Sequence, residues 1–148
     1  MKNKIRIIIL ALFALYSAYF FIGGTLAPIM AHFKHYELSA KLTSLFLHSC
    51  HQQPDRSFWI LGYPMALCCR CFGVYFATTF LSIYSIFNKL KINKHAIIIL
   101  ILISLIDVYA NVKLGINTGN IIRFIVGIII GFLIIFTING IFEIKRRS

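Results

Sequence analysis

Residues 121–144, IIRFIVGIIIGFLIIFTINGIFEI, form the longest mostly apolar run near the C-terminal end, interrupted by only a few polar residues. A helix of about 20 mostly apolar residues spans the hydrocarbon core of a bilayer. Three further runs of comparable length lie upstream, at residues 5–27, 65–87 and 96–114. The sequence therefore predicts an all-α membrane protein with four transmembrane helices.

Two other interpretations of these runs are less favoured. The third and fourth runs are rich in β-branched residues, which suits buried strands, but strands average only about five or six residues. The basic start MKNKIR would suit a cleaved signal peptide. The first apolar run exceeds the usual 7–15 residues, however, and Pro28 follows the best cleavage site at residues 25–27. We therefore expect an uncleaved first helix.

Composition supports a single integral membrane domain over residues 1–148. The chain is 59% hydrophobic with a mean hydropathy of +0.86, whereas soluble domains are about half apolar. The net charge of +11 would suit a nucleic-acid partner, but the basic residues form short clusters between apolar runs. That pattern favours contact with anionic lipid headgroups, so the expected partner is the bilayer of a bacterial or archaeal plasma membrane.

The distribution of lysine and arginine predicts the orientation. Nine basic residues fall on one side of a four-helix layout: Lys2, Lys4, Arg6, Lys89, Lys91, Lys94, Lys145, Arg146 and Arg147. The other side carries four, spread over longer segments: Lys34, Lys41, Arg56 and Lys113. Because cytoplasmic loops are enriched in basic residues, both termini are predicted to be cytoplasmic, with the loop at residues 28–64 outside.

That outward loop is itself patterned. Residues 37–49, ELSAKLTSLFLHS, place apolar side chains at helical spacing: Leu38, Leu42, Leu45 and Phe46. We expect an amphipathic helix that lies on the membrane surface or over the bundle. A turn is expected at residues 53–55, and a break at residues 62–64 before the second span.

Polar residues from three segments share one predicted depth, at the outer ends of the spans. Cys68, Arg70 and Cys71 lie in the first turns of the second span, Asp107 lies late in the third, and Arg123 opens the fourth. An acid within a span is costly and usually has a partner, and Arg70 and Arg123 are the available ones. We therefore expect a polar pocket there.

All four cysteines lie in CHQQPDRSFWILGYPMALCCRC, residues 50–71. This segment resembles the DUF2085 family of small predicted membrane proteins, whose pattern is roughly CHQ-x-P-x-RSF followed by P-x-C-x-RC-x-G-x-Y. Five downstream residues resemble the later part of the family pattern, an Asp, an Asn-x-x-Arg and spaced glycines: Asp107, Asn120, Arg123, Gly127 and Gly131. Here the gap between Pro64 and Cys68 is slightly longer, and Cys69 occupies a variable position. The resemblance implies a membrane fold and no particular activity.

The motif contains a candidate metal site. Cys50, His51, Cys68 and Cys71 offer three thiolates and an imidazole, which suit zinc or another thiophilic metal. A helix start and Arg70 would favour thiolates at the Cys-x-x-Cys pair. The alternative is a disulfide, either Cys68–Cys71 or Cys50 with one of them, because the outer side of a membrane is oxidising. Cys69 is interpreted as a small core residue.

The charged residues also have two interpretations. Asp107 would serve as a general acid or base, with Arg56, Arg70 and Arg123 as contacts to an anion or substrate. Alternatively, Asp107 forms a structural ion pair with an arginine, and Arg56 anchors the loop at lipid headgroups.

Three functions follow from these patterns. The first is a metal-dependent or thiol-redox membrane enzyme that acts on a lipid or a small molecule. The second is a non-catalytic protein that binds metal, cofactor or lipid, and the third is an accessory subunit with a structural disulfide. A nucleotide-binding glycine loop is absent from the sequence, so ATP-driven transport by this chain alone is not expected. Gly127 and Gly131 indicate close helix packing, and the oligomeric state is left open.

Overall fold

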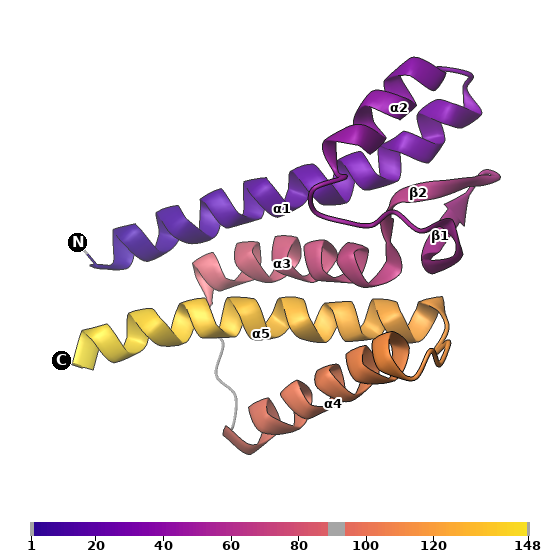
Figure 1. Cartoon of the computed structure of the whole chain (residues 1–148). Helices are drawn as coiled ribbons and strands as arrows, with labels where there is room; N and C mark the ends of the chain where they lie inside the picture. The colour runs from indigo at the N-terminus through magenta and orange to yellow at the C-terminus, as the bar shows by residue number, and fades with distance from the viewer. Residues whose placement is uncertain (1, 89–93, 148) are drawn as a thin grey trace.

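A computed structural model describes residues 2–88 and 94–147. Within these residues the elements follow one another in this order: α1 (Lys2–His32), α2 (Tyr36–Leu45), the 3-10 helix η1 (Pro54–Arg56), β1 (Ser57–Ile60), β2 (Tyr63–Cys68), α3 (Cys69–Phe87), α4 (Lys94–Lys113) and α5 (Asn120–Arg147) (Figure 1). The predominantly helical fold is therefore confirmed, with one short hairpin added.

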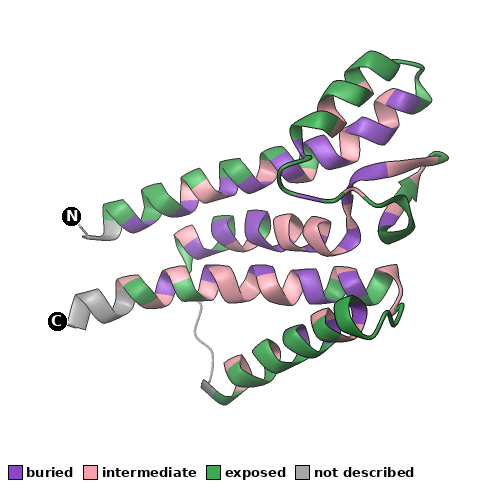
Figure 2. Ribbon diagram, viewed as in Figure 1, coloured by how far each residue is buried: buried purple, intermediate pink, exposed green. Residues whose placement is uncertain are grey.

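Four helices are long and apolar enough to cross a membrane: Lys4–His32, Cys69–Phe87, His95–Lys113 and Asn120–Phe142. On α4, polar side chains point into the protein and apolar side chains point outward, which is the reverse of the usual arrangement in a soluble protein. On α4, Ser104, Asp107 and Asn111 are buried, whereas Leu105 and Ile106 are 60% and 67% exposed (Figure 2). A surface of this kind suits lipid, so burial and composition agree on four membrane helices.

The helices lie side by side, with α3 between α1 and α5, and α4 against the other side of α5 (Figure 1). Glycines permit the close contact between α3 and α5. A Cβ on Gly73 would collide with the Phe124 carbonyl oxygen, and one on Gly127 with the Arg70 carbonyl oxygen. Gly131 faces Ala77 in the same interface. This is the small-residue packing that the sequence predicts.

The start of the second span differs from the prediction. Residues 63–68 form strand β2, which pairs with β1 in an antiparallel hairpin, so α3 begins at Cys69 rather than at residue 65. Leu61 and Gly62 have φ values of 52° and 85°, as two-residue hairpin turns require. Ala66 and Leu67 are buried in a cluster with α1 residues, so their apolar character reflects burial in protein.

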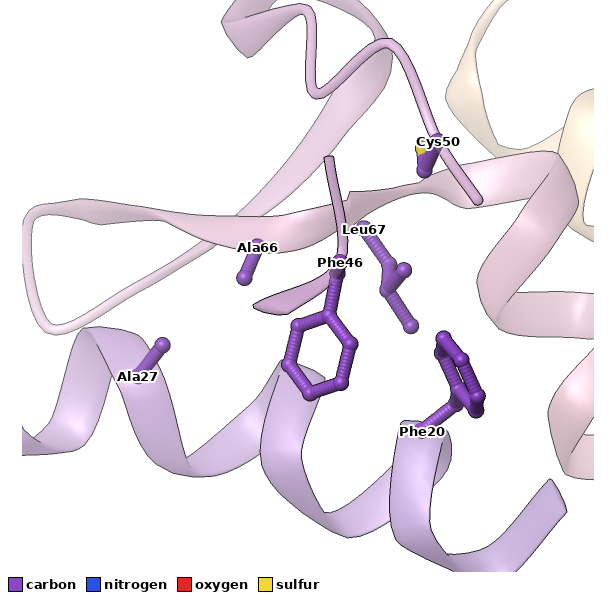
Figure 3. Close-up of a cluster of buried hydrophobic side chains, with 6 residues drawn as sticks. All are labelled: Phe20, Ala27, Phe46, Cys50, Ala66 and Leu67. Carbon is purple, nitrogen blue, oxygen red and sulfur yellow. The ribbon is translucent and has the colours of Figure 1, made fainter. Parts of the chain in front are cut away.

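The expected loop helix is present as α2, which is shorter than residues 37–49. Only part of its predicted apolar face is buried, because Leu38 and Leu45 are exposed. Phe46, directly after α2, is fully buried against Phe20 and Ala27 of α1 (Figure 3). Ser39 Oγ also donates a hydrogen bond to the Ala27 carbonyl oxygen at 2.8 Å. These contacts hold α2 and the following loop on α1, which continues through Pro28 to His32.

Both termini lie at one end of the helices, and α2 and the hairpin lie at the other (Figure 1). We call the second end the loop end: it comprises α2, η1, β1, β2, the start of α3, the end of α4 and the start of α5. Several basic residues that predict the orientation, among them Lys89 and Lys91, lie outside the described residues, as do the side chains of Lys2, Lys94 and residues 145–147. The cytoplasmic placement of the termini thus stays a prediction.

Candidate functional site

Three sulfur atoms converge at the loop end. The Sγ atoms of Cys50, Cys68 and Cys71 all lie within 4.8 Å of one another, and we call them the sulfur cluster. Cys68 Sγ and Cys71 Sγ are 3.3 Å apart. Cys50 comes from the loop after Phe46, Cys68 ends β2, and Cys71 lies in the first turn of α3. The cluster therefore joins segments that are about twenty residues apart in the chain.

The local fold explains this convergence. The Cys50 backbone N–H donates to the Phe46 carbonyl oxygen at 3.0 Å, which ties Cys50 to the buried phenylalanine. Cys50 is only 5% exposed and belongs to the apolar cluster of Figure 3. The hairpin returns the chain to this point, where the Cys68 backbone N–H donates to Cys50 Sγ at 3.1 Å. Cys68 is extended, and α3 then presents Cys71 one turn later.

The cluster is electrostatically asymmetric. Hydrogen bonds with the Cys50 and Cys71 thiols hold the pKa of the Cys68 thiol far below its ordinary range, and the charge of Arg70 acts in the same direction. The hydrogen bond with Cys68 raises the pKa of the Cys50 thiol. The arrangement thus favours one thiolate, on Cys68, stabilised by two neighbouring thiols.

The structure brings together three of the four expected metal ligands. His51 is exposed, and its imidazole is not among the converging ligand atoms. Cys69 is fully buried and lies outside the cluster, as a core residue would. All four cysteines are free thiols in this structure. The 3.3 Å between Cys68 Sγ and Cys71 Sγ is longer than a disulfide bond of about 2.05 Å.

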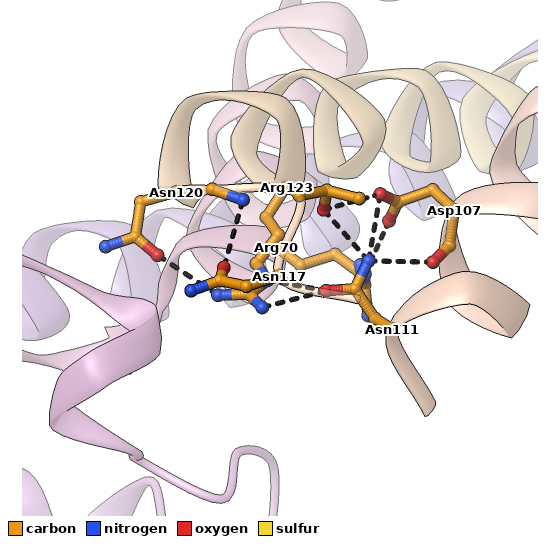
Figure 4. A network of polar contacts seen from close by, with 8 residues as sticks. Arg70, Asp107, Asn111, Asn117, Asn120 and Arg123 are labelled. Atoms are coloured by element: carbon orange, nitrogen blue, oxygen red, sulfur yellow. Dashed lines mark hydrogen bonds and ion pairs between the residues drawn. The ribbon is translucent and has the colours of Figure 1, made fainter. Parts of the chain in front are cut away.

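A second polar centre surrounds Asp107, which is buried near the end of α4 (Figure 4). Arg70 Nη2 forms an ion pair with Asp107 Oδ2 at 2.5 Å. Asn111 Nδ2 and Thr118 Oγ1 donate to the other carboxylate oxygen at 3.1 and 3.0 Å. Both oxygens of the acid are therefore engaged, and α3, α4 and the α4–α5 connection are joined through them.

Arg123 joins this network through an amide. Its Nε and Nη2 donate to Asn111 Oδ1 at 3.0 and 2.8 Å, and its Nη1 donates to Asn120 Oδ1 at 3.3 Å. Asn120 Nδ2 in turn donates to the Ser57 carbonyl oxygen at 3.2 Å, which links α5 to the hairpin. Of the two arginines considered as partners for Asp107, Arg70 makes the direct contact.

Arg56 lies apart from the sulfur cluster. It is exposed in η1, and its guanidinium makes no hydrogen bond or ion pair with the described residues. It lines a polar cavity of about 210 Å³ together with Asp55, Asn111, Asn117 and Arg123. Cys71 borders a different, apolar cavity of about 250 Å³ between α1, α3 and α5, lined by residues such as Phe13 and Val74.

Sequence reasoning missed a further polar network at the end that carries the termini. Arg6 is 9% exposed; its Nη2 donates to the Ser85 carbonyl oxygen at 3.0 Å, and its Nη1 to Asn139 Oδ1 at 3.3 Å. Asn139 Nδ2 donates to Ser85 Oγ at 3.2 Å. Ser85 and Asn139 could have indicated this network in the sequence, because polar side chains inside apolar runs usually have partners.

Comparison with known proteins now places the chain. Residues 50–137 match a family model described as "Predicted membrane protein (DUF2085)". The chain belongs to the DUF2085 family. The matched range includes the sulfur cluster, Asp107 and Arg123, so both polar centres fall within the part of the chain that defines this family.

Two archaeal proteins are similar to this DUF2085 member. An uncharacterized protein of Methanocaldococcus jannaschii is 37% identical over 134 residues, which cover 83% of this chain and 85% of the relative. An uncharacterized protein of Methanothermobacter thermautotrophicus is 25% identical over 86 residues, or 56% of this chain and 78% of the relative. No solved structure matches.

Proposed function

We propose that this membrane protein binds a thiophilic metal ion, zinc or Cu(I), through Cys50, Cys68 and Cys71. The observation that carries the proposal is the convergence of three sulfurs within 4.8 Å. Zn–S bonds of about 2.3 Å in a tetrahedron place sulfurs about 3.8 Å apart. The sulfur cluster is already close to that spacing, so binding requires only small side-chain adjustments. A disulfide, by contrast, uses only two thiols.

Three sulfur ligands define the kind of site. A tetrahedral zinc ion bound by three thiolates keeps its fourth position open to water or another ligand, whereas Cu(I) is satisfied by soft thiolates alone. His51, adjacent to Cys50, is exposed and free to approach such a position. Arg70, between the cluster cysteines in sequence, offsets the negative charge of the thiolates. The site thus suits a metal with an exchangeable ligand.

The proposed orientation places this site outside the plasma membrane. The basic residues near both termini favour the cytoplasm for that end, and the loop end then faces outward. We infer metal binding without turnover, because Asp107, the candidate general acid or base, has both carboxylate oxygens engaged by Arg70, Asn111 and Thr118. A lipid or small molecule would be a ligand here rather than a substrate.

A second candidate function is thiol–disulfide exchange. The 3.3 Å between Cys68 and Cys71 and the lowered pKa of Cys68 favour it. The Cys68 thiolate would attack an incoming disulfide and release one thiol. Cys71 would then attack the mixed disulfide, releasing the second thiol and leaving a Cys68–Cys71 disulfide.

Metal analysis and thiol counting separate the two candidates. The full chain is purified in detergent without chelators and under anaerobic conditions, and its metal content is measured by mass spectrometry. We expect one thiophilic metal ion per chain, lost in Cys50→Ala, Cys68→Ala and Cys71→Ala. Cys69→Ala is the matched control, because Cys69 lies in the same segment and outside the sulfur cluster.

The outcomes are distinct. Metal retained by all three cluster variants, or lost equally from Cys69→Ala, contradicts the metal site. Exchange chemistry is supported if the wild-type protein carries no metal and reductant exposes two additional thiols in it. Reductant should then expose no additional thiols in Cys71→Ala, which cannot form the Cys68–Cys71 disulfide. Wild-type protein with neither metal nor a reducible pair excludes both functions.

A further inference from the structure

We infer that the polar cavity between η1 and the α4–α5 connection binds an oxyanion, a phosphate or carboxylate group, between Arg56 and Arg123. The cavity measures about 210 Å³ and is lined by Asp55, Arg56, Asn111, Gly115, Ile116, Asn117 and Arg123. A water molecule takes about 30 Å³ of liquid, so a phosphate group fits with room for bridging water. This site is separate from the sulfur cluster and independent of its metal.

Arg123 supplies the buried cation. It is only 6% exposed, and three of its N–H groups donate to the amide oxygens of Asn111 and Asn120. A guanidinium has five N–H donors, so two remain for a ligand. The nearby carboxylate of Asp107 is paired with Arg70, and so Arg123 forms no ion pair with the described residues. Its direct hydrogen bonds are to amide oxygens, and the Asp107 carboxylate stabilises its charge only at longer range.

The position of Arg123 in α5 adds to the excess of positive charge at this site. It lies in the first turn of the helix, where the unpaired backbone N–H groups carry a partial positive charge. Acidic side chains are the usual occupants of a first turn, and α5 has none there. A cation at this position is stabilised by an anion that faces both the side chain and the helix start.

Arg56, in η1, supplies the second cation of the cavity lining. Its guanidinium has no partner among the described residues, and its charge repels that of Arg123. Two arginines that share a cavity and repel each other gain from an oxyanion that accepts hydrogen bonds from both. Asp55 is the only acid in the cavity lining, so one negative charge faces two positive charges.

The oxyanion could be supplied by a lipid headgroup or by a soluble anion. The cavity lies at the loop end, next to exposed apolar side chains such as Val112, Leu114 and Ile121, where a lipid phosphate would reach it from the bilayer. A free phosphate or small carboxylate would reach it from the aqueous side. Both bind through the two arginines, and the choice of probe distinguishes them.

The test uses the full chain in detergent. Native mass spectrometry counts bound phosphatidylglycerol, with phosphatidylcholine as the zwitterionic comparison, and calorimetry measures binding of inorganic phosphate. Arg56→Gln should weaken binding about tenfold, the loss expected for a hydrogen-bonded charge contact. Asp55→Asn should strengthen it about two- to fivefold by removing the one opposing charge. Lys113→Gln is the control, because it removes an exposed cation of the loop end that does not line the cavity.

The outcomes decide the inference and the source together. Selective binding of phosphatidylglycerol that follows the variant order identifies a lipid headgroup site. Binding of inorganic phosphate in that order, with displacement of lipid, identifies a soluble oxyanion. Equal effects of Arg56→Gln and Lys113→Gln, weaker binding in Asp55→Asn, or no saturable binding of either probe overturns the site. Metal content should be unchanged in these variants, because none of them alters the sulfur cluster, so the result is independent of that cluster.

Discussion

The two polar centres of the loop end differ in how completely the protein satisfies them. In the Asp107 network, one arginine, one amide and one hydroxyl occupy both oxygens of the acid. In the sulfur cluster, the thiols contact one another and one backbone N–H, that of Cys68 to Cys50 Sγ, and no charged side chain forms a hydrogen bond with a sulfur in the described residues. The first arrangement is complete without a ligand, and the second gathers donors that a metal ion would use.

Location explains why the two centres differ. Asp107 lies within a span, where lipid cannot solvate a charge and an ionised acid must be neutralised by protein. Thiols are neutral when protonated, so folding does not require partners for them. The convergence of three thiols is therefore not a requirement of folding in the way that the Asp107–Arg70 pair is. This difference is the reason for assigning structure to one centre and binding to the other.

The comparison predicts the largest loss of stability at the acid. Asp107→Asn removes the ion pair and leaves Arg70 without a counter-charge, and breaking a buried pair in this way costs about 3–5 kcal/mol. The free energy of unfolding is measured by titration with SDS in mixed micelles. Glu37→Gln, which neutralises an exposed acid of α2, is the control and should change it by less than about 0.5 kcal/mol.

If Asp107→Asn lowered the free energy of unfolding no more than Glu37→Gln does, the proposed structural role of the Asp107 network would be contradicted. Metal content per folded chain should stay at the wild-type value in the Asn variant, because the sulfur cluster does not use the acid.

The second largest effect is expected at the glycines between α3 and α5. A Cβ at Gly127 meets the carbonyl oxygen of Arg70, and backbone cannot move aside as a flexible side chain can. Gly127→Ala should cost about 1–3 kcal/mol by the same unfolding assay, through overpacking. Gly140→Ala has open space and helical backbone, so it should stabilise by about 0.5–1 kcal/mol. Destabilisation by both variants to a similar degree would contradict the close contact.

Much of the membrane fold could be predicted because length and apolar character are properties of single segments. Four spans, the glycine contact and a pairing of Asp107 with an arginine all follow from residue types at known depths. The hairpin could not be predicted in this way, because YPMALC is as apolar as a span. Its strand conformation is set by the positive-φ turn at residues 61–62 and by burial against α1.

The candidate site, like the fold, was predictable only where it depends on a single segment. Cys68 and Cys71 are three residues apart, so their proximity follows from a helix start. That Cys50 joins them depends on the hairpin and on Phe46, which are tertiary features. His51 was expected beside Cys50 because the two are adjacent in sequence. Neighbouring side chains in an irregular segment often point in different directions, and here only the cysteine faces inward.

A smaller effect is expected where the hairpin meets α5. Asn120→Ala removes the hydrogen bond to the Ser57 carbonyl oxygen and one acceptor of Arg123, which together should cost about 1–2 kcal/mol. Hydrogen exchange of the β1 amides should quicken, because the hairpin loses its contact with α5. Asn88→Ala, at an exposed position after α3, is the control. Unchanged exchange in β1 would show that the hairpin is held by its apolar contacts alone.

The smallest effect, and the sharpest test of the comparison between the two centres, is expected at His51. Its imidazole is exposed and outside the sulfur cluster, so His51→Ala should lower metal affinity by less than about tenfold, whereas a ligand lost from Cys50→Ala abolishes stoichiometric binding. Competition with a chromophoric chelator measures both affinities, and the free energy of unfolding should be unchanged in the histidine variant. If His51→Ala lost metal as completely as Cys50→Ala, the imidazole would be a fourth ligand. The loop after Phe46 would then rearrange on binding, and the site would be closed rather than open.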